Sequence, residues 1–375
     1  MDNESEFNRR ALLSFGTVAV LSPMLRLFPV QAVRISGRSA WLAGVFASVP
    51  MLLYVLFLAA FMSRRRGGEN LQELILRALG DKVGKAALLL MSLWLILYAG
   101  FVLRSGSDRL VVTVYTSSSP AAFSIVMGTA VLPAVLGCRR TLVRSAQVIR
   151  PIVLFSLLLI LGFALLSVSG DNLLPVTAED VLSAWKGSLS GIDVLAVSAY
   201  SLCFIIAGAE SADGLGRDLM LWVFRLSLLM SLIGLAIVGC FGAELAELLT
   251  LPFFVLVRNL VFFRSLERVE ALIVMLWIFP DFLLVALFVY SASSCLRLVF
   301  GFSPAEKATR LTDMRNGRWL IPLCLTASIC ISILLAPDAV SMELWSLSLI
   351  PGINLAFSFL FLPAVYVVGR LRKSI

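Results

Sequence analysis

Long apolar stretches separated by short polar segments run through the whole chain of 375 residues. A helix that crosses the hydrocarbon core of a bilayer needs about 20 consecutive, mostly apolar residues. A membrane β-barrel would show short segments of alternating polarity instead. The pattern therefore predicts a single all-α membrane domain over residues 1–375, with ten transmembrane helices. The predicted spans are about 11–33, 40–62, 83–104, 119–137, 149–169, 190–208, 220–243, 268–297, 318–336 and 344–369.

Composition and charge placement support this reading and add an orientation. The chain is 60% hydrophobic and only 14% charged, and its mean hydropathy is +0.98. Its acidic start and long first apolar run disfavour a cleavable signal peptide. The net charge is +8, and most of the 31 lysines and arginines lie in segments that share one side when both termini are cytoplasmic. By the positive-inside rule, we predict cytoplasmic N- and C-termini.

The residue types argue against several classes of function. The chain has no histidine, and its six cysteines show no metal-ligand spacing, so we expect no metal site. No nucleophile motif or phosphate-binding glycine loop occurs, so we expect neither an enzyme nor a bound cofactor. No basic stripe with interleaved aromatic residues is present, so we expect no nucleic-acid partner.

Two of the predicted spans carry signals of broken helices. In the first span, Pro23 and Pro29 each remove a backbone donor and flank Arg26 at membrane depth. In the sixth, small residues over 198–210 favour unwinding. Many transporters bind their ligand between two broken helices in corresponding halves. Spans one and six are five apart, as a five-plus-five inverted repeat requires. The alternative is that Pro23 only kinks a packed helix, and that Ser198 and Ser201 only bond their own backbone.

Polar elements flank the predicted spans on both sides. Residues 64–80 place apolar side chains on one helix face and predict an amphipathic helix on the inner surface. Residues 244–264 predict helical pieces across the outer mouth. Glu267, Arg268 and Glu270 lie at the mouth of the eighth span, and Glu267 and Glu270 share a helix face with Trp277. The general reading is that these charges snorkel to the interface.

The stretch that contains these charges also carries a motif, which consists of Pro252, Leu266, Glu267, Arg268, Glu270, Trp277 and Ile278. With this motif and its ten spans, the chain resembles the B subunit of bacterial spore germinant receptors, the GerAB-type spore germination permeases of the amino acid–polyamine–organocation transporter superfamily. Weaker matches lie at 70–84, at the pair Arg104 and Asp108, and at Pro337 and Asp338.

The resemblance implies a ten-helix transporter-like fold with a ligand pocket at the membrane midplane. Glycines of the family's broken first helix are replaced here by Ser22 and Met24, on either side of Pro23. Val102 and Cys203 stand near places where members carry glutamates. Tyr98 is expected to close the pocket from span three. The candidate ligand-binding residues are Ser22, Met24, Tyr98, Phe101, Ser198, Ser201 and Cys203.

Two charges are predicted to lie furthest from water, Arg26 and Asp281. A lone charge at the bilayer centre costs about 2.5–3.5 kcal/mol on insertion scales, which favours a partner or a wet cavity. The family fold would make spans one and eight neighbours, so we predict an Arg26–Asp281 ion pair beside the helix loosened by Pro280. The alternative is that Arg26 snorkels outward and Asp281 lines a wet crevice. Glu267, Arg268 and Glu270 are assigned to outer gating or subunit contact.

The resemblance further implies a ligand-sensing subunit in the inner membrane of the bacterial spore. It would bind a small germinant, typically an amino acid, and signal to an A subunit and a lipoprotein C subunit. The alternative is an amino-acid transporter of the same superfamily, ion-coupled or passive. A third possibility is a scaffold with a degenerate pocket, given the substitutions in spans one, three and six.

Overall fold

All regular structure in the described part of the chain is helical. The computed structural model describes residues 7–66, 68–113, 115, 117–137, 139–206, 214–260, 269–302, 317–335 and 339–375, without the side chains of 269–274 and 339–340. The longer helices are α1 (Arg9–Ser36), α2 (Ala40–Met62), α4 (Asp81–Thr113), α5 (Pro120–Leu136), α6 (Arg139–Leu165), α7 (Ala178–Leu202), α8 (Leu215–Phe241), α12 (Val269–Val299) and α13 (Leu320–Leu334).

Several of these helices begin at sequence-encoded caps. The Asn8 side chain accepts a hydrogen bond from the Arg10 amide at the start of α1 (2.9 Å). Thr177 and Asp180 form a capping box at the start of α7, in which the Thr177 amide donates to the Asp180 carboxylate (2.8 Å). Such caps satisfy amide groups that have no partner within the helix.

The last part of the chain is a continuous helical stretch with two π-helical segments. It consists of α14 (Ala339–Leu344), a π segment at Trp345–Leu349, α15 (Ile350–Ala356), a second π segment at Phe357–Phe361, and α16 (Leu362–Leu371). Single π turns in membrane and soluble helices often occur at functional sites because they re-aim side chains. Here they bracket α15.

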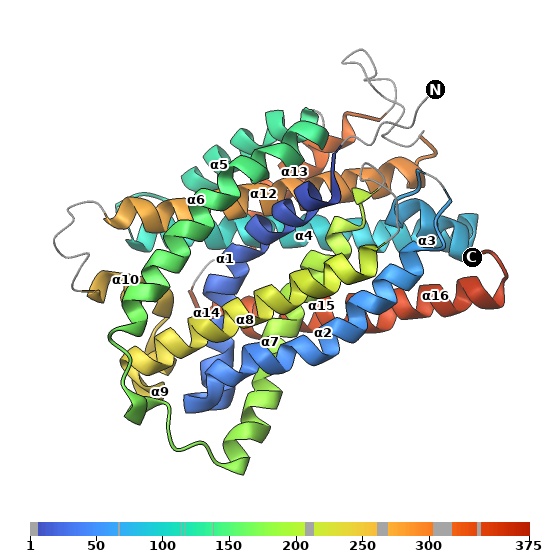
Figure 1. The fold of residues 1–375 in the computed structure, drawn as a ribbon. Helices are drawn as coiled ribbons and strands as arrows, with labels where there is room; N and C mark the ends of the chain where they lie inside the picture. The colour runs from blue at the N-terminus through green and yellow to red at the C-terminus, as the bar shows by residue number, and fades with distance from the viewer. Residues whose placement is uncertain are drawn as a thin grey trace.

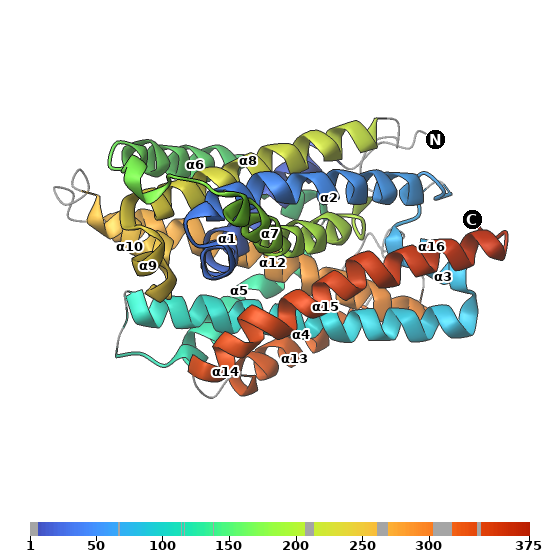
Figure 2. The ribbon, with the colours of Figure 1, turned by 90° about the horizontal axis from the view of Figure 1, so that it is seen from below.

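The short helices lie at opposite ends of the bundle. Helix α3 (Leu71–Leu79) and the end of α16 lie at one end, and α9 (Ala243–Leu248) and α10 (Pro252–Asn259) lie at the other (Figures 1 and 2). The helix predicted within 64–80 is present as α3, and it buries its apolar face against α4 and α16. The helical pieces predicted within 244–264 are present as α9 and α10.

Helices α1, α4 and α12 form the centre of the packing. Helix α1 packs against α7, α6 and α12, and α12 packs along α4. Helix α2 lies along α8, where the two backbones approach closely at Gly44. A Cβ atom on Gly44 would lie 2.5 Å from the Ser231 amide nitrogen, so this contact requires glycine.

Six helical stretches of the described chain are long and apolar enough to cross a membrane, with α1 and α2 counted together as one. Helices α5 and α13 are apolar but shorter. The predicted span ranges fall largely on helices, but several helix ends differ. Helix α6 begins at Arg139, before the predicted start at 149. Helix α4 continues to Thr113, nine residues beyond the predicted end at 104. Helix α7 begins at Ala178, before the predicted start at 190, and ends at Leu202.

The predicted break in the first span is wrong for this structure. Helix α1 continues without interruption through Pro23 and Pro29. Its residues from 11 to 33 are almost all buried between neighbouring helices, and this packing holds the helix where two backbone hydrogen bonds are lost. In the sixth span, the helix does end within the stretch 198–210. The described chain shows one helix end at Leu202, and not two halves of a broken span.

Candidate functional site

A buried ion pair lies where α1, α4 and α12 meet. The Arg109 guanidinium on α4 pairs with the Asp281 carboxylate on α12 through Nη2 and Oδ2. Their side chains are only 4% and 3% exposed, so water screens this pair little. A charge buried without its partner would be strongly unfavourable, so the two groups depend on each other.

The remaining contacts of Arg109 hold its guanidinium in one orientation. Its Nη1 donates to the Ser22 hydroxyl on α1 (3.0 Å), and its Nε donates to the Ser105 carbonyl one turn earlier (3.2 Å). The guanidinium also lies over the Trp277 ring, 5.2 Å from its centroid. Trp277 and Asp281 are four residues apart on α12, so the same helix face supplies both contacts. Three helices are thereby tied together through one side chain.

Gly106 makes room for the Asp281 carboxylate. A Cβ atom at Gly106 would lie 2.8 Å from Asp281 Oδ2, closer than real Cβ contacts permit. The glycine next to Ser105 therefore lets α12 bring its carboxylate close to the α4 backbone and within reach of Arg109.

The predicted Arg26–Asp281 ion pair is wrong, because Arg109 takes the place assigned to Arg26. Arg26 instead lies over the Phe101 ring, with its Cζ atom 5.2 Å from the centroid. Within the described part of the chain, no carboxylate lies within 4.0 Å of the Arg26 guanidinium nitrogens. Arg109 lies beyond the predicted end of span three at 104, so the sequence did not indicate it as a partner. Helix α4 continues past that point and brings Arg109 level with Asp281.

The centre itself holds almost no free space. A cavity of about 10 Å³ lies between α1, α4 and α12, and its lining includes Ser22, Arg26, Tyr98 and Phe101 beside the ion pair. This is about the volume that one water molecule requires. The structure therefore brings these predicted site residues together, in a closed state that leaves no space for an organic ligand.

A larger pocket opens beside this centre. Its volume is about 460 Å³, within the range of small-molecule sites. We refer to it as the vestibule. It shares Arg26, Ser105 and Arg109 with the central cavity, and Thr250 and Leu251, between α9 and α10, also line it. The vestibule therefore leads from the α9–α10 end of the molecule to the buried ion pair.

The charged lining of the vestibule is predominantly positive. It contains four arginines and two carboxylates: Arg26, Arg34, Arg104, Arg109, Asp108 and Glu343. Arg104 pairs with Asp108 on α4 (3.0 Å), which places this predicted pair at the pocket wall. Arg34 on α1 pairs with Glu343 on α14. Since Arg109 pairs with Asp281, Arg26 is the arginine of this lining without a carboxylate partner among the described residues.

The other predicted ligand-binding residues lie away from both cavities. Met24 is fully buried in the apolar core. The Ser198 hydroxyl donates to the Val194 carbonyl in its own helix (2.9 Å), as the alternative reading of this residue expected. Ser201 and Cys203 are buried at the end of α7, where the Cys203 carbonyl accepts from the Leu71 amide of α3 (3.0 Å). Neither residue lines the central cavity or the vestibule.

The remaining predicted gating residues lie partly outside the described chain. Glu267 and Arg268 are not among the described residues, and of Glu270 only the helical backbone in α12 is described. The weaker family match at Pro337 and Asp338 also lies outside the described residues. Pro23 lines the central cavity on α1.

A second buried polar centre was missed by the sequence analysis. The Asn354 amide on α15 donates to the Asp193 carboxylate on α7 (2.6 Å), and both residues are fully buried. Tyr98, which lines the central cavity, lies next to Asn354 and so connects the two centres. Asp193 could have been found by the argument applied to Asp281, since both are acids within apolar stretches.

Comparison with known proteins assigns the family. The sequence model described as "Spore germination protein" matches residues 20–340, which is most of the chain. The chain belongs to this family of spore germination permeases. None of the individually curated proteins compared with it matches.

Solved transporter structures share the fold. A Na⁺-coupled sialic acid symporter in a substrate-bound, outward-open state aligns with a TM-score of 0.60 at 11% identity, over 95% of this chain and 80% of that chain. Mhp1, a nucleobase-cation-symport-1 family transporter in a closed conformation, aligns with a TM-score of 0.60 at 11% identity, over 96% of this chain and 82% of that chain. With its long apolar helices, the family member described here is a multi-pass, permease-like membrane protein with a transporter fold.

Proposed function

We propose that this permease is the ligand-sensing subunit of a bacterial spore germinant receptor. It binds a small germinant, an amino acid, in the vestibule. Binding favours one conformation, and this change signals to an A subunit and a lipoprotein C subunit. In this proposal the whole chain is one membrane domain that crosses the inner spore membrane ten times, with both termini in the cytoplasm. The family membership and the transporter fold support it.

The observation that carries this proposal is Arg26 at the inner end of the vestibule. Among the described residues, it is the arginine of the lining without a carboxylate partner, and it lies on the boundary between the open pocket and the closed centre. Arg26 is half-buried, and a partly buried cation without a counter-charge is costly at membrane depth. A ligand carboxylate would supply that counter-charge. Guanidinium and carboxylate groups also match each other in geometry. An amino acid carries this carboxylate.

Ligand binding would act by favouring one conformation over another. The centre is closed in this structure, with space for about one water molecule. A carboxylate bound to Arg26 would stabilise a state in which the central cavity is wider and open to the vestibule. The ligand can shift this equilibrium only by its difference in affinity for the two states.

The same proposal includes a five-plus-five inverted repeat. Helices α1 and α7 are then the first members of the two halves. Helix α1 supplies Ser22 and Arg26 to the central site, and α7 supplies Asp193 to the second polar centre. The two buried polar centres would thus belong to corresponding helices of the two halves.

Germination of spores that lack this gene tests the proposal. We expect loss of response to one class of germinant in a panel of amino acids and sugars, restored by the intact gene. Arg26→Gln should fail to restore it, while Arg26→Lys, which retains the charge, should restore it in part. Arg38→Gln is the matched control, since Arg38 is exposed and outside the vestibule lining. An unchanged response of the deletion strain to the whole panel would contradict the proposal.

The fold neighbours favour a second candidate, an amino-acid transporter that is ion-coupled or passive. Both neighbours are transporters, and one is Na⁺-coupled by its description. Purified protein in proteoliposomes distinguishes the two. A transporter would carry the amino acid that triggers germination into the vesicles without partner subunits, whereas a sensor would bind it with little flux. A degenerate scaffold would show neither binding nor an effect of Arg26→Gln.

A further inference from the structure

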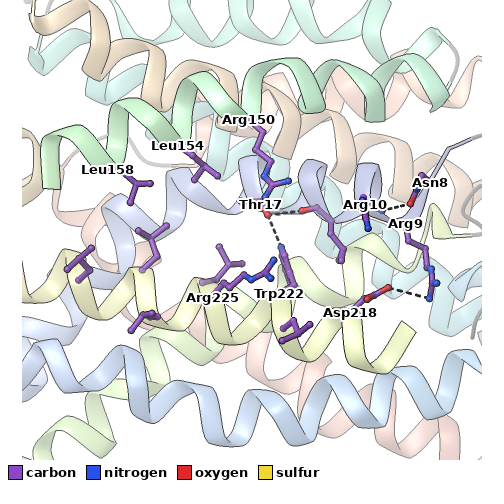
Figure 3. Close-up of a pocket in the computed structure, with 16 residues that line it drawn as sticks. Asn8, Arg9, Arg10, Thr17, Arg150, Leu154, Leu158, Asp218, Trp222 and Arg225 are labelled. Atoms are coloured by element: carbon purple, nitrogen blue, oxygen red, sulfur yellow. Dashed lines mark hydrogen bonds and ion pairs between the residues drawn. The ribbon is translucent and has the colours of Figure 1, made fainter. Parts of the chain in front are cut away.

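A second large pocket lies at the other end of the molecule from the vestibule, between α1, α6 and α8. Its volume is about 1020 Å³. None of the residues that line it lines the vestibule or the central cavity. We refer to it as the α1–α6–α8 groove. Figure 3 shows its lining side chains, which come from all three helices.

The lining of this groove changes character along its length. Arginines gather toward the start of α1, and leucines of α6 and α8 line the other part (Figure 3). Leu158 and Leu228 are more than half exposed, although α6 and α8 are both apolar enough to span a membrane. On a membrane helix, such exposed leucines face lipid chains. The groove is therefore open to the bilayer along its apolar part.

The charge of the groove is strongly positive. Four arginines line it, Arg9, Arg10, Arg150 and Arg225, against a single carboxylate, Asp218. Asp218 pairs with Arg9 (3.3 Å). Among the described residues, no carboxylate oxygen lies within 4.0 Å of the guanidinium nitrogens of Arg10, Arg150 or Arg225.

The arginines are held at the groove by contacts with its walls. The Arg150 Nη1 donates to the Ser14 hydroxyl on α1 (3.0 Å). On the facing wall, Trp222 of α8 donates from Nε1 to the Thr17 hydroxyl of α1 (3.0 Å). These hydrogen bonds hold α6 and α8 against α1 at the polar part of the groove. Arg150 has further N–H donors, and Arg10 and Arg225 are exposed, so these guanidinium groups can donate to a ligand.

We propose that the α1–α6–α8 groove binds an anionic phospholipid of the adjacent leaflet, with its phosphate among Arg10, Arg150 and Arg225. Its acyl chains would lie along Leu154, Leu158 and Leu228. Cations without a carboxylate partner among the described residues, beside lipid-exposed leucines, match the two parts of such a lipid. Basic pockets between membrane helices bind acidic headgroups in this way. In the orientation proposed above, this is the inner leaflet. The site does not depend on the identity of the germinant.

Quenching of tryptophan fluorescence by brominated lipids tests this proposal on the full-length protein in bilayers. We compare vesicles containing brominated phosphatidylglycerol or brominated phosphatidylcholine, each diluted in unlabelled phosphatidylcholine. Because Trp222 lines the groove, we expect stronger quenching by phosphatidylglycerol, and Trp222→Phe should remove the difference. Each arginine is expected to contribute about fivefold to the preference, at about 1 kcal/mol for a basic residue near an anionic surface.

The triple variant Arg10→Gln, Arg150→Gln, Arg225→Gln should lose the preference for phosphatidylglycerol. The control variant Arg140→Gln, Arg144→Gln, Arg370→Gln removes the same charge from exposed positions outside the groove and should keep it. Lysine at the three groove positions should retain most of it. If the glutamine variant does not fold, the lysine variant and the wild-type comparison still decide the question.

Three results would overturn the proposal. Equal quenching by the two brominated lipids would show that the groove does not select an anionic headgroup. Equal loss in the groove and control variants would show a general attraction of the charged surface. Loss of the preference on addition of inorganic phosphate, at constant ionic strength, would show a site for the free anion and not for a lipid.

Discussion

Arg109 connects more of the candidate site than any other side chain described. It pairs with Asp281, donates to Ser22 and to the Ser105 carbonyl, and lies over Trp277. These contacts come from three helices, so a change at Arg109 affects both stability and the shape of the site. Arg26, one helix away, contacts an aromatic ring and lacks a carboxylate partner in the described chain. The two arginines therefore differ in their surroundings, and in the function proposed above Arg109 has a structural role and Arg26 binds the ligand.

We predict that breaking the Arg109–Asp281 pair strongly destabilises the protein. Arg109→Leu or Asp281→Leu alone leaves a buried charge and should each lower the free energy of unfolding by about 3–5 kcal/mol. The double variant removes both charges and should be less harmful than the sum of the two. Chemical unfolding in detergent measures these values. Arg26→Leu is the control and should cost much less. Additive losses in the double variant would contradict the pairing.

A substitution at Gly106 tests the close approach of the Asp281 carboxylate to the backbone of α4. Gly106→Ala would place a Cβ atom 2.8 Å from Asp281 Oδ2. We expect a loss of about 1–3 kcal/mol, because the carboxylate must shift away from Arg109. Gly162→Ala is the matched control: it also lies in a membrane helix, and nothing lies within 4 Å of its Cβ position. This control should be neutral or stabilising. Equal thermal stability of the two variants would refute the close approach.

At the scale of elements, helix ends and helix irregularities decide which polar groups meet. Helix α4 extends to Thr113 and so carries Arg109 to the level of Asp281 on α12. Two π segments bracket α15, which places Asn354 against Asp193 of α7. Tyr98 on α4 lies between these two contacts. The packing of α7 and α15 is thus coupled through buried polar groups.

We predict that Asn354→Leu loosens the contact between α7 and α15. It removes the donor to the fully buried Asp193 and should cost about 1–3 kcal/mol, the usual penalty for a buried polar group without a partner. Asp193→Asn retains a hydrogen-bonding partner for Asn354 and should be milder. Thermal unfolding of the two variants in detergent measures the difference. A larger loss for Asp193→Asn would show that the carboxylate has a role beyond this bond.

At the scale of the whole molecule, the vestibule and the α1–α6–α8 groove lie toward opposite ends. The vestibule is bordered by the α9–α10 connection, and the groove by the start of α1. In the proposed topology, the vestibule faces outward, and the arginines of the groove face the cytoplasmic leaflet. A ligand and a lipid would then act on the same helix, α1, from opposite sides of the membrane.

Cysteine labelling tests this arrangement. Thr250→Cys, at the exposed edge of the vestibule, should react with a membrane-impermeant maleimide in sealed right-side-out vesicles. Ser63→Cys, exposed beyond the end of α2, should react only after the vesicles are permeabilised. The wild-type chain gives the background from its own cysteines. The reverse pattern would show that the membrane orientation is inverted.

The sequence by itself determined the class of the protein and most of its helices. Apolar stretches of membrane-spanning length and the motif from Pro252 to Ile278 are local features, readable without knowledge of distant contacts. The family and the transporter fold follow from them, and the comparisons confirm both. Ser22, Tyr98, Phe101 and Asp281 were also selected from the sequence, and the structure places them around one cavity.

Only the tertiary structure decided which charges meet and whether a helix breaks. Asp281 could accept a bond from any arginine at its depth, and the extension of α4 decided in favour of Arg109 over Arg26. Two prolines weaken α1, but burial between α6, α7 and α12 keeps it helical. Asp193 and Asn354 are 161 residues apart and meet only through packing. Pairing and helix continuity depend on contacts between distant segments, and helix formation in apolar stretches does not.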